Sequence, residues 1–411
     1  MSLAHLIACS GCGISRPFED GYAFIHDCLQ DDLFHKAELS VQTSHLPELF
    51  TGELFMNQSD SKRVLYFDAL ETLSIFLVVS VHSVWLNGNV PASISMSLSP
   101  AAVPVFFMVH GALLLRKNFS WKKHCARMVK TIFQLLAWNT IYLLICLWEG
   151  LTDSPVSIGY LYEYYVEGAV LRAPMGGVLW FIFALLSVYL LFPVLSAIKP
   201  SRKVLIYVAG ISFLFGFCVK ELEVWGQAFG SIFTDREFTL SSLNNYLSPF
   251  GTYVNCIFFF VYGFLLAEKL REWNGSPLRK QVRISCCLIL FGIALMMLER
   301  RVEFGTFNYN WRPLSEQYMR VGTVLMATGL FSLFSRIPFR EEKCGILVKI
   351  STHTIDIYYI HAIIVRLVYD HLFEQRYAGV LPNYLRALAV LVLSYWIGKI
   401  IRRIPLIRKL L

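Results

Sequence analysis

Three ionisable side chains lie in one apolar run and could act together in catalysis. Asp68, Glu71 and His82 all fall between residues 64 and 87. In a helix, Glu71 and His82 are about 20° apart around the axis and about 16 Å apart along it, and Asp68 shares their face. Ionisable groups inside a membrane are costly and mark functional sites. We therefore predict that His82 is a general base or acyl carrier, oriented by Glu71 or Asp68. A neutral histidine bonded to a backbone carbonyl is the structural alternative.

Two further apolar runs carry polar residues. His110 lies in one of them, and Arg116 follows at its end, as either a positive-inside anchor or an anion ligand. A later run contains His353, Asp356 and His361. Because His353 and Asp356 are three residues apart, they can pair on one helical face, and we favour a structural pair. The sequence has no nucleophile elbow, phosphate-binding glycine loop or HExxH zinc motif.

The elements that must position these residues are membrane helices. The 411-residue chain is 56% hydrophobic and only 16% charged, whereas a soluble domain usually carries about 25% charged residues. This composition excludes an ordinary soluble enzyme, a disordered protein and a nucleic-acid reader, and it makes the lipid bilayer a partner. A span needs about 20 mostly apolar residues. We predict an all-α polytopic membrane protein with about ten transmembrane helices, at 64–87, 97–116, 127–149, 177–198, 203–222, 246–268, 281–299, 317–336, 345–369 and 384–405.

The distribution of Lys and Arg orients these spans. If the segment before the first span is cytoplasmic, the inside segments hold 25 Lys and Arg and the outside segments hold 10. Cytoplasmic loops of membrane proteins carry an excess of these residues. We therefore predict that both termini are cytoplasmic, and that the chain is a multi-pass protein of the cytoplasmic (inner) membrane.

Residues 1–60 differ from the rest of the chain. They carry two basic and nine acidic residues, a net charge of −7, which leaves +15 for residues 61–411. Cys9 and Cys12 form a lone CxxC without a second pair at zinc spacing, so we predict no metal site. We predict an acidic N-terminal tail over 1–60, either disordered or an artefactual extension upstream of Met56, and a membrane-embedded domain over 61–411.

Four segments, in order, resemble a known family of membrane enzymes. Residues 66–71 read YFDALE and lead to His82, residues 103–114 read VPVFFMVHGALL, residues 179–186 read LWFIFALL, and residues 357–361 read IYYIH. This ordered set resembles the acyltransferase type 3 family of integral membrane O-acyltransferases, which includes surface-polysaccharide O-acetyltransferases. The resemblance runs from about residue 63 to the C-terminus, so residues 61–411 are predicted to be an acyltransferase-like domain.

The resemblance implies transfer of an acyl group, usually acetyl from acetyl-CoA, to a hydroxyl of a cell-surface glycan or glycolipid, with His82 catalytic. Acyl-CoA is then a donor substrate, and no cofactor is bound permanently. The sequence departs from the family at two positions, because Glu71 replaces an arginine eleven residues before the histidine and His110 replaces a serine. A carboxylate cannot bind CoA phosphates as an arginine does, so an active enzyme needs other basic groups for them.

Basic residues behind the second span are the predicted CoA ligands: Arg116, Lys122, Lys123 and Arg127. Three residues of later or neighbouring spans are predicted to contact the acceptor substrate: His110, Trp180 and His361. Two other functions stay open. One is a transporter or flippase of a lipid-linked sugar, against which the lack of a clear inverted repeat counts. The other is a divergent, non-catalytic member of the family.

Overall fold

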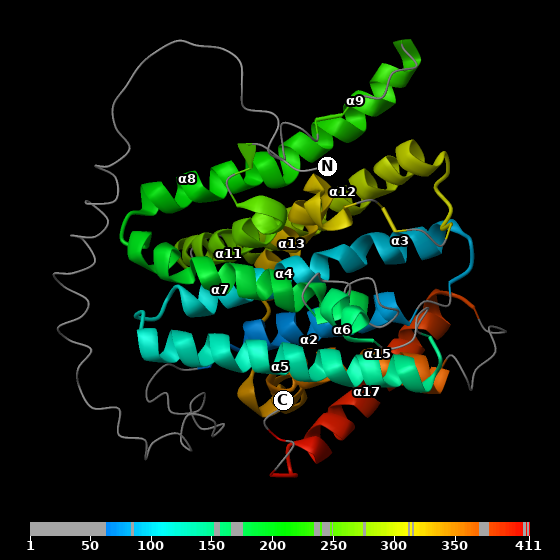
Figure 1. Cartoon of the computed structure of the whole chain (residues 1–411). Coiled ribbons are helices and arrows are strands. Elements are labelled where there is room, and N and C mark those ends of the chain that lie inside the picture. Colours follow the sequence, from blue (N-terminus) through cyan, green and yellow to red (C-terminus); the bar gives the residue numbers. More distant parts are fainter. Residues whose placement is uncertain are drawn as a thin grey trace, which may run out of the picture. The chain divides into compact units, whose positions relative to one another are not determined.

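The computed structural model describes most of the chain from residue 63 onward. The described residues are 63–83, 86–151, 157–165, 176–233, 239–240, 247–248, 250–273, 277–310, 313–314, 316–369, 378–405, 408 and 411, and the predicted tail over 1–60 lies outside them. Every regular element among these residues is helical, as predicted. Most of the helix axes follow a common direction (Figure 1).

Fourteen α-helices are defined in the described part of the chain. They are α2 (Leu65–His82), α3 (Val90–Leu98), α4 (Ala102–Leu114), α5 (Trp121–Trp148), α6 (Ile158–Tyr165), α7 (Trp180–Ile198), α8 (Arg202–Phe213), α9 (Val219–Phe233), α11 (Val254–Glu272), α12 (Leu278–Phe304), α13 (Val321–Phe334), α14 (Gly345–Thr352), α15 (Thr354–Ile364) and α17 (Val380–Ile401). A π-helical segment, Leu214–Cys218, joins α8 to α9, and another, Val365–Tyr369, follows α15.

Eight helical stretches within the described residues are long and apolar enough to cross a membrane: Leu65–His82, Val90–Leu114, Trp121–Trp148, Gly177–Ile198, Arg202–Gly230, Gly251–Glu272, Leu278–Phe304 and Val380–Ile401. The other two predicted spans are helical but shorter or interrupted. α13 has 14 residues, and the span predicted over 345–369 is divided at His353, where φ is −106° and ψ is 14°. The predicted count of ten is therefore not confirmed, and the orientation of the termini stays a prediction.

α2 is packed against several other helices, including α4, α14, α15 and α17. The position of α4 depends on glycines at its crossing with α11. A Cβ atom on Gly111 would lie 1.7 Å from the carbonyl oxygen of Phe260, and one on Gly263 would lie 2.2 Å from the backbone of Met108. Small residues allow membrane helices to approach this closely. This crossing fixes α4, which in turn contacts the helix that carries His82.

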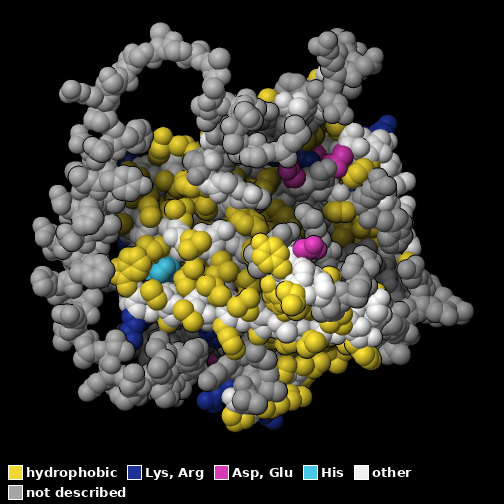
Figure 2. Space-filling view, in the orientation of Figure 1, with side chains coloured by type: hydrophobic (Ala, Val, Ile, Leu, Met, Phe, Trp, Pro, Cys, Tyr) yellow, Lys and Arg dark blue, Asp and Glu magenta, His cyan; other side chains and the backbone are white. Residues whose placement is uncertain are grey.

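Large apolar side chains cover the outside of the helices as well as the core. Figure 2 shows a broad hydrophobic area that contains few charged side chains. Leu290 and Phe291 on α12 and Trp396 on α17 are exposed examples. An apolar surface of this extent is unusual for a protein in water, whereas the hydrocarbon core of a bilayer can cover it. The surface agrees with a multi-pass membrane protein.

Candidate active site

His82 lies at the end of α2 and lines a small cavity of about 20 Å³. The walls of this histidine cavity come from α2, α4, α7, α15 and three short 3₁₀ turns, and most of them are apolar or aromatic. The lining residues are Val78, Val81, His82, Ser99, Ala102, Val103, Phe106, Val178, Trp180, Phe181, Tyr318 and Tyr358. An imidazole at an apolar cavity can take the proton of a hydroxyl group that is placed beside it.

A second histidine, from a distant part of the chain, lies beside His82. The ring centroids of His82 and His361 are 5.2 Å apart, and the ring planes are inclined by 47°. His361 is fully buried on α15, and its Nδ1 lies 3.1 Å from the carbonyl oxygen of Ile357. Its Nε2 is buried and has no hydrogen-bond partner among the described residues. We refer to His82 and His361 as the histidine pair.

The last turn of α2 is held in place by hydrogen bonds. Nδ2 of the buried Asn383 on α17 donates to the carbonyl oxygen of Ser80 at 3.2 Å. The hydroxyl of Ser83, directly after His82, donates to the carbonyl oxygen of Val79 at 2.8 Å. His82 itself is exposed. A fixed backbone therefore carries a side chain that a substrate can reach.

Aromatic side chains form much of the wall of the histidine cavity. Trp180 lies 4.9 Å from Tyr318, measured between ring centroids, and the hydroxyl of Tyr358 donates to the carbonyl oxygen of Val178. His110, by contrast, is not among the residues that line the cavity, and its Nδ1 lies 3.2 Å from the carbonyl oxygen of Phe106. Of the predicted acceptor contacts, the structure therefore places Trp180 at the cavity and His361 behind His82, but not His110.

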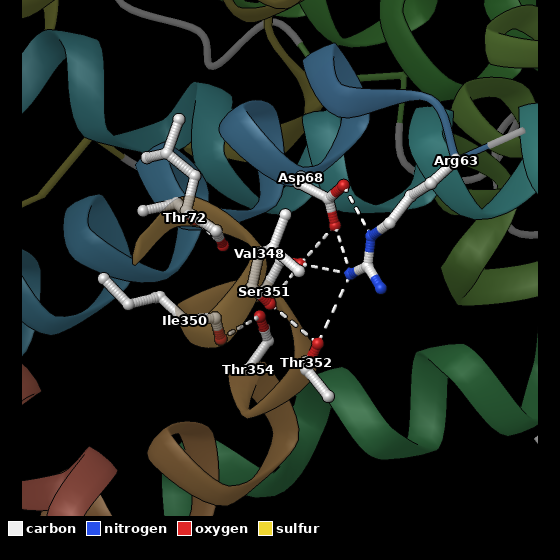
Figure 3. Close-up of polar contacts among 9 residues, drawn as sticks. Arg63, Asp68, Thr72, Val348, Ile350, Ser351, Thr352 and Thr354 are labelled. Atoms are coloured by element: carbon white, nitrogen blue, oxygen red, sulfur yellow. Dashed lines mark hydrogen bonds and ion pairs between the residues drawn. The ribbon is translucent and has the colours of Figure 1, made fainter. Parts of the chain in front are cut away.

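The first polar residue of α2, Asp68, is engaged at the opposite end of the helix. Nε and Nη2 of Arg63 donate to the Asp68 carboxylate at 2.8 and 2.5 Å (Figure 3). Nη2 also donates to the hydroxyls of Ser351 and Thr352 at 3.2 and 3.3 Å, and the Ser351 hydroxyl donates to Asp68. These four residues, which we call the Arg63 cluster, join the start of α2 to α14.

The charges of the Arg63 cluster compensate one another. The hydrogen bond to Asp68 raises the pKa of the Arg63 guanidinium. The Asp68 side chain is only 7% exposed, whereas that of Arg63 is 50% exposed. Asp68 also lies in the first turn of α2, where the helix dipole favours an anion. Because Asp68 is paired here, about 21 Å along the helix from His82, it does not contact that histidine.

Glu71 lies near the Arg63 cluster and not near His82. It is half-buried, and the charges of Asp68 and Arg63 both act on it. The helical rise from Glu71 to His82 is about 16 Å. The three residues predicted to act together therefore share one helix but no common contact. The structure gives His82 a histidine neighbour in place of a carboxylate.

A second hollow, of about 420 Å³, is strongly basic. Its charged lining consists of four cations and one acid: Arg116, Lys199, Arg202, Arg271 and Glu268. Arg202 pairs with Glu272 at 3.3 Å, and Nζ of Lys199 donates to the carbonyl oxygen of Lys117 at 3.2 Å. Arg116 and Arg271 form no hydrogen bond or ion pair within the described residues. Two guanidinium groups in this basic hollow are therefore available to an anion.

The basic hollow adjoins the N-terminal end of α2. Tyr66, in the first turn of α2, is influenced by the charges of both Arg116 and Arg271. His82 lies about 24 Å further along the same helix. The basic hollow and the histidine cavity are therefore associated with opposite ends of α2.

Two other predicted CoA ligands, Arg127 and Lys123, lie near Lys117, whose carbonyl oxygen is bonded to Lys199 of the basic hollow. Burial lowers the pKa of Lys117, and the nearby charges of Arg127 and Lys123 lower it further. The Arg127 guanidinium lies over two aromatic rings, at 5.4 and 5.9 Å from their centroids, and its buried Nη1 has no partner within the described part of the chain. Lys122 is exposed and does not line the hollow. Of the four predicted ligands, Arg116 lines the hollow, and Arg127 and Lys123 add to the positive field beside it.

The predicted pair of His353 and Asp356 is present and includes a third residue. Nδ1 of His353 lies 2.5 Å from Oδ2 of Asp356, and Nη2 of Arg402 donates to Oδ1 at 2.8 Å. Asp356 is fully buried, and it lines neither hollow. Among the described residues, no group of three or more His, Cys, Asp or Glu side chains could hold a metal ion. This network joins α15 to the end of α17 and is structural.

Five residues of these sites have contacts that depend on distant parts of the chain and were not predicted from the sequence: Arg63, Ser351, Lys199, Arg271 and Tyr318. Arg63 and Ser351 are 288 positions apart, and no local spacing connects them. One local signal was available for Arg63. With Glu71 at the position of the family's arginine, Asp68 needed a cation from elsewhere, and Arg63 precedes it by five residues.

The helices and their apolar surface describe a multi-pass membrane protein in which a histidine lines a small cavity and four cations line a second hollow. A family model described as an acyltransferase domain, that of the type 3 acyltransferases, matches residues 64–403. The chain therefore belongs to the type 3 acyltransferase family, as the resemblance predicted, and its general class is that of a membrane acyltransferase. No curated protein and no solved structure matches the chain.

Proposed function

We propose that the protein transfers an acyl group, acetyl first among them, from acyl-CoA to a hydroxyl of a cell-surface glycan or glycolipid at the inner membrane. The observation that carries this proposal is the association of the basic hollow and the histidine cavity with opposite ends of α2. An anionic donor and a hydroxyl-bearing acceptor could approach these two ends separately. In this proposal the basic hollow faces the cytoplasm, where acyl-CoA is available.

The donor binds through its phosphates. Arg116 and Arg271 are without other partners in the described residues, and a guanidinium group binds phosphate oxygens bidentately. Lys199 and Arg202 add positive charge to the same hollow, which attracts an anion before contact. The pantetheine arm then follows α2 towards His82 and brings the thioester to the histidine cavity.

The acceptor hydroxyl is activated by His82. Its oxygen attacks the carbonyl carbon of the thioester, so that a C–O bond forms and the C–S bond breaks. His82 takes the hydroxyl proton and returns it to the departing thiolate, and CoA leaves as the free thiol. Trp180 and Tyr318 offer an aromatic wall on which a sugar ring or the apolar part of a glycolipid can pack. No net proton is consumed.

The donor site can be tested by release of CoA thiol from the purified protein in nanodiscs. Arg116→Ala and Arg271→Ala should each raise KM for acyl-CoA roughly tenfold or more, because each removes a charge-assisted hydrogen bond. Acyl-pantetheine, which lacks the nucleotide phosphates, should show no such difference between the wild type and these variants. Arg279→Ala is the matched control, since Arg279 is an exposed cation on α12 outside the hollow. Equal effects of all three substitutions would refute the assignment of the hollow.

The acceptor can be identified in cells. Envelope glycans from a null strain and from a strain complemented with the wild-type gene should differ in O-acyl groups, and complementation with His82→Gln should not restore them. The alternative is a flippase. It would be supported if the wild type and His82→Gln both transported a lipid-linked sugar across vesicle membranes and neither released thiol from any acyl-CoA.

A further inference from the structure

His361 holds a buried nitrogen whose hydrogen-bonding state is fixed by its surroundings. Its side chain is fully buried, and Nδ1 lies 3.1 Å from the carbonyl oxygen of Ile357. A carbonyl oxygen only accepts hydrogen bonds, so Nδ1 carries the proton. A neutral imidazole has one N–H, and therefore Nε2 presents a lone pair. Nε2 is buried and has no partner among the described residues.

A buried hydrogen-bond acceptor without a donor is unfavourable. Three neighbouring side chains could donate to Nε2 of His361: Tyr358, Tyr359 and His82. The hydroxyl of Tyr358 already donates to the carbonyl oxygen of Val178. Tyr359 precedes His361 by two residues and so points to the other side of the helix, where its ring stacks on Trp138 of α5 with centroids 5.1 Å apart. The ring of His82 is 5.2 Å from that of His361, between centroids. His82 is thus a neighbour that can supply an N–H.

We propose that His361 is a positioning residue that accepts the N–H of His82 and thereby fixes the tautomer in which the other nitrogen of His82 faces the cavity as a base. A rotation of the exposed His82 ring about χ2, a torsion with broad preferences, brings the two nitrogens together. This role replaces the direct acceptor contact that sequence analysis predicted for His361. Its catalytic consequence rests on the proposed function.

The arrangement also stabilises the charge that forms during transfer. When the cavity-facing nitrogen of His82 takes the proton of the acceptor hydroxyl, the ring becomes an imidazolium. The N–H that already donates to Nε2 of His361 stays in place, and this hydrogen bond becomes stronger because its donor is now charged. On return of the proton to the thiolate, His82 reverts to the same tautomer. The pair is thus ready for another cycle without a net change of protons.

The kcat and KM of two His361 variants distinguish a positioning role of His361 from a purely structural one. His361→Phe keeps a ring but removes the acceptor, and kcat should fall about 10- to 100-fold while KM for both substrates changes little. His361→Gln offers an amide oxygen near the position of Nε2 and should recover most of that loss. His124→Phe is the matched control, because His124 is also buried with an unpartnered Nδ1 among the described residues. A rise in KM for the acceptor with unchanged kcat in His361→Phe would overturn the proposal in favour of substrate contact.

A spectroscopic measurement tests the pair without any turnover. ¹⁵N spectra of histidine-labelled protein in nanodiscs, with the His82 signals assigned by their loss in His82→Gln, report which ring nitrogen carries the proton. We expect one tautomer of His82 in the wild type and in His124→Phe, and a mixture in His361→Phe. A mixture in the wild type, or a single tautomer that survives His361→Phe, would refute the proposal. If the tautomer depends on His361 but no acyl-CoA is turned over, the proposed function fails and the positioning role stands.

Discussion

The two ends of α2 differ in whether the polar groups there have hydrogen-bond partners. At the N-terminal end, the members of the Arg63 cluster bond to one another: Arg63, Asp68, Ser351 and Thr352. At the C-terminal end, the histidine pair leaves a buried nitrogen of His361 without a partner in the described residues, next to His82 at a cavity. A paired group stabilises the fold, whereas an unpaired acceptor beside His82 can orient that histidine, as proposed above.

The carboxylates of α2 and His82 look alike in the sequence but differ in their surroundings in the structure. Asp68, Glu71 and His82 lie on one helix face and inside one apolar run. Yet the distance of about 16 Å or more between the carboxylates and His82 allows them independent roles. Asp68 helps to attach α2 to α14, and Glu71 lies near it, whereas His82 acts as the base in the proposed function. Substitutions at the two ends should therefore affect different measurements.

The largest effect is expected at the histidine cavity. His82→Gln removes the base and should lower kcat about 10²- to 10⁴-fold, the usual contribution of general acid–base catalysis. Because His82 is exposed, the midpoint of thermal unfolding in detergent should stay unchanged. Thiol release and thermal unfolding of the same preparation check both parts. Turnover within threefold of the wild type would remove His82 from the mechanism, as would a fall in kcat that a loss of folded protein explains.

The Arg63 cluster should show the reverse pattern. Asp68→Asn breaks an ion pair whose carboxylate is 7% exposed and whose guanidinium is 50% exposed, so the free energy of unfolding should fall by about 1–3 kcal/mol. The thermal midpoint should then drop by several degrees, while kcat per folded molecule changes less than about threefold.

A double-mutant cycle connects this loss to Arg63. In an Arg63→Gln background, Asp68→Asn should cost clearly less stability than in the wild type, because the partner has already gone. Equal costs in both backgrounds would show that Asp68 stabilises α2 through another contact.

Substitution of Glu71 tests the hypothesis that this carboxylate orients His82, which the structure does not support. Glu71→Gln keeps the size of the side chain and removes a negative charge that lies near Asp68. We expect kcat to stay within about threefold of the wild type and stability to stay level or rise slightly, since two like charges are no longer close. The same thiol-release and unfolding measurements apply. A hundredfold loss of kcat would restore Glu71 to the catalytic site.

The class of fold was predictable because lipid imposes a simple rule on sequence. Apolar runs of about 20 residues must form helices that bury their backbone polar groups, and the structure is helical in every predicted run. The count was less predictable. The run over 345–369 is mostly apolar, but the helix is broken at His353, which pairs with Asp356. A hydropathy profile does not show such a break.

The site was predictable only where its signal was local. His82 and Trp180 stand in short segments that resemble a family, Arg116 closely follows another such segment, and the structure places each of the three at a hollow. The partners of Asp68 and His82 could not be found in this way, because Ser351 and His361 come from 283 and 279 positions further along the chain. Spacing along one helix shows which residues share a face, but tertiary packing decides what that face meets.

The smallest effect should come from the outermost member of the Arg63 cluster. Ser351 and Thr352 are adjacent, and both accept a hydrogen bond from Nη2 of Arg63, at 3.2 and 3.3 Å. Ser351 is buried and also donates to Asp68, whereas Thr352 is exposed. Ser351→Ala should therefore lower the free energy of unfolding by about 1 kcal/mol, and Thr352→Val by less than about 0.5 kcal/mol, with kcat unchanged in both. Denaturant unfolding in detergent measures the difference. Equal losses would mean that burial does not decide the strength of this cluster, because water could then replace the Ser351 hydroxyl as readily as that of Thr352.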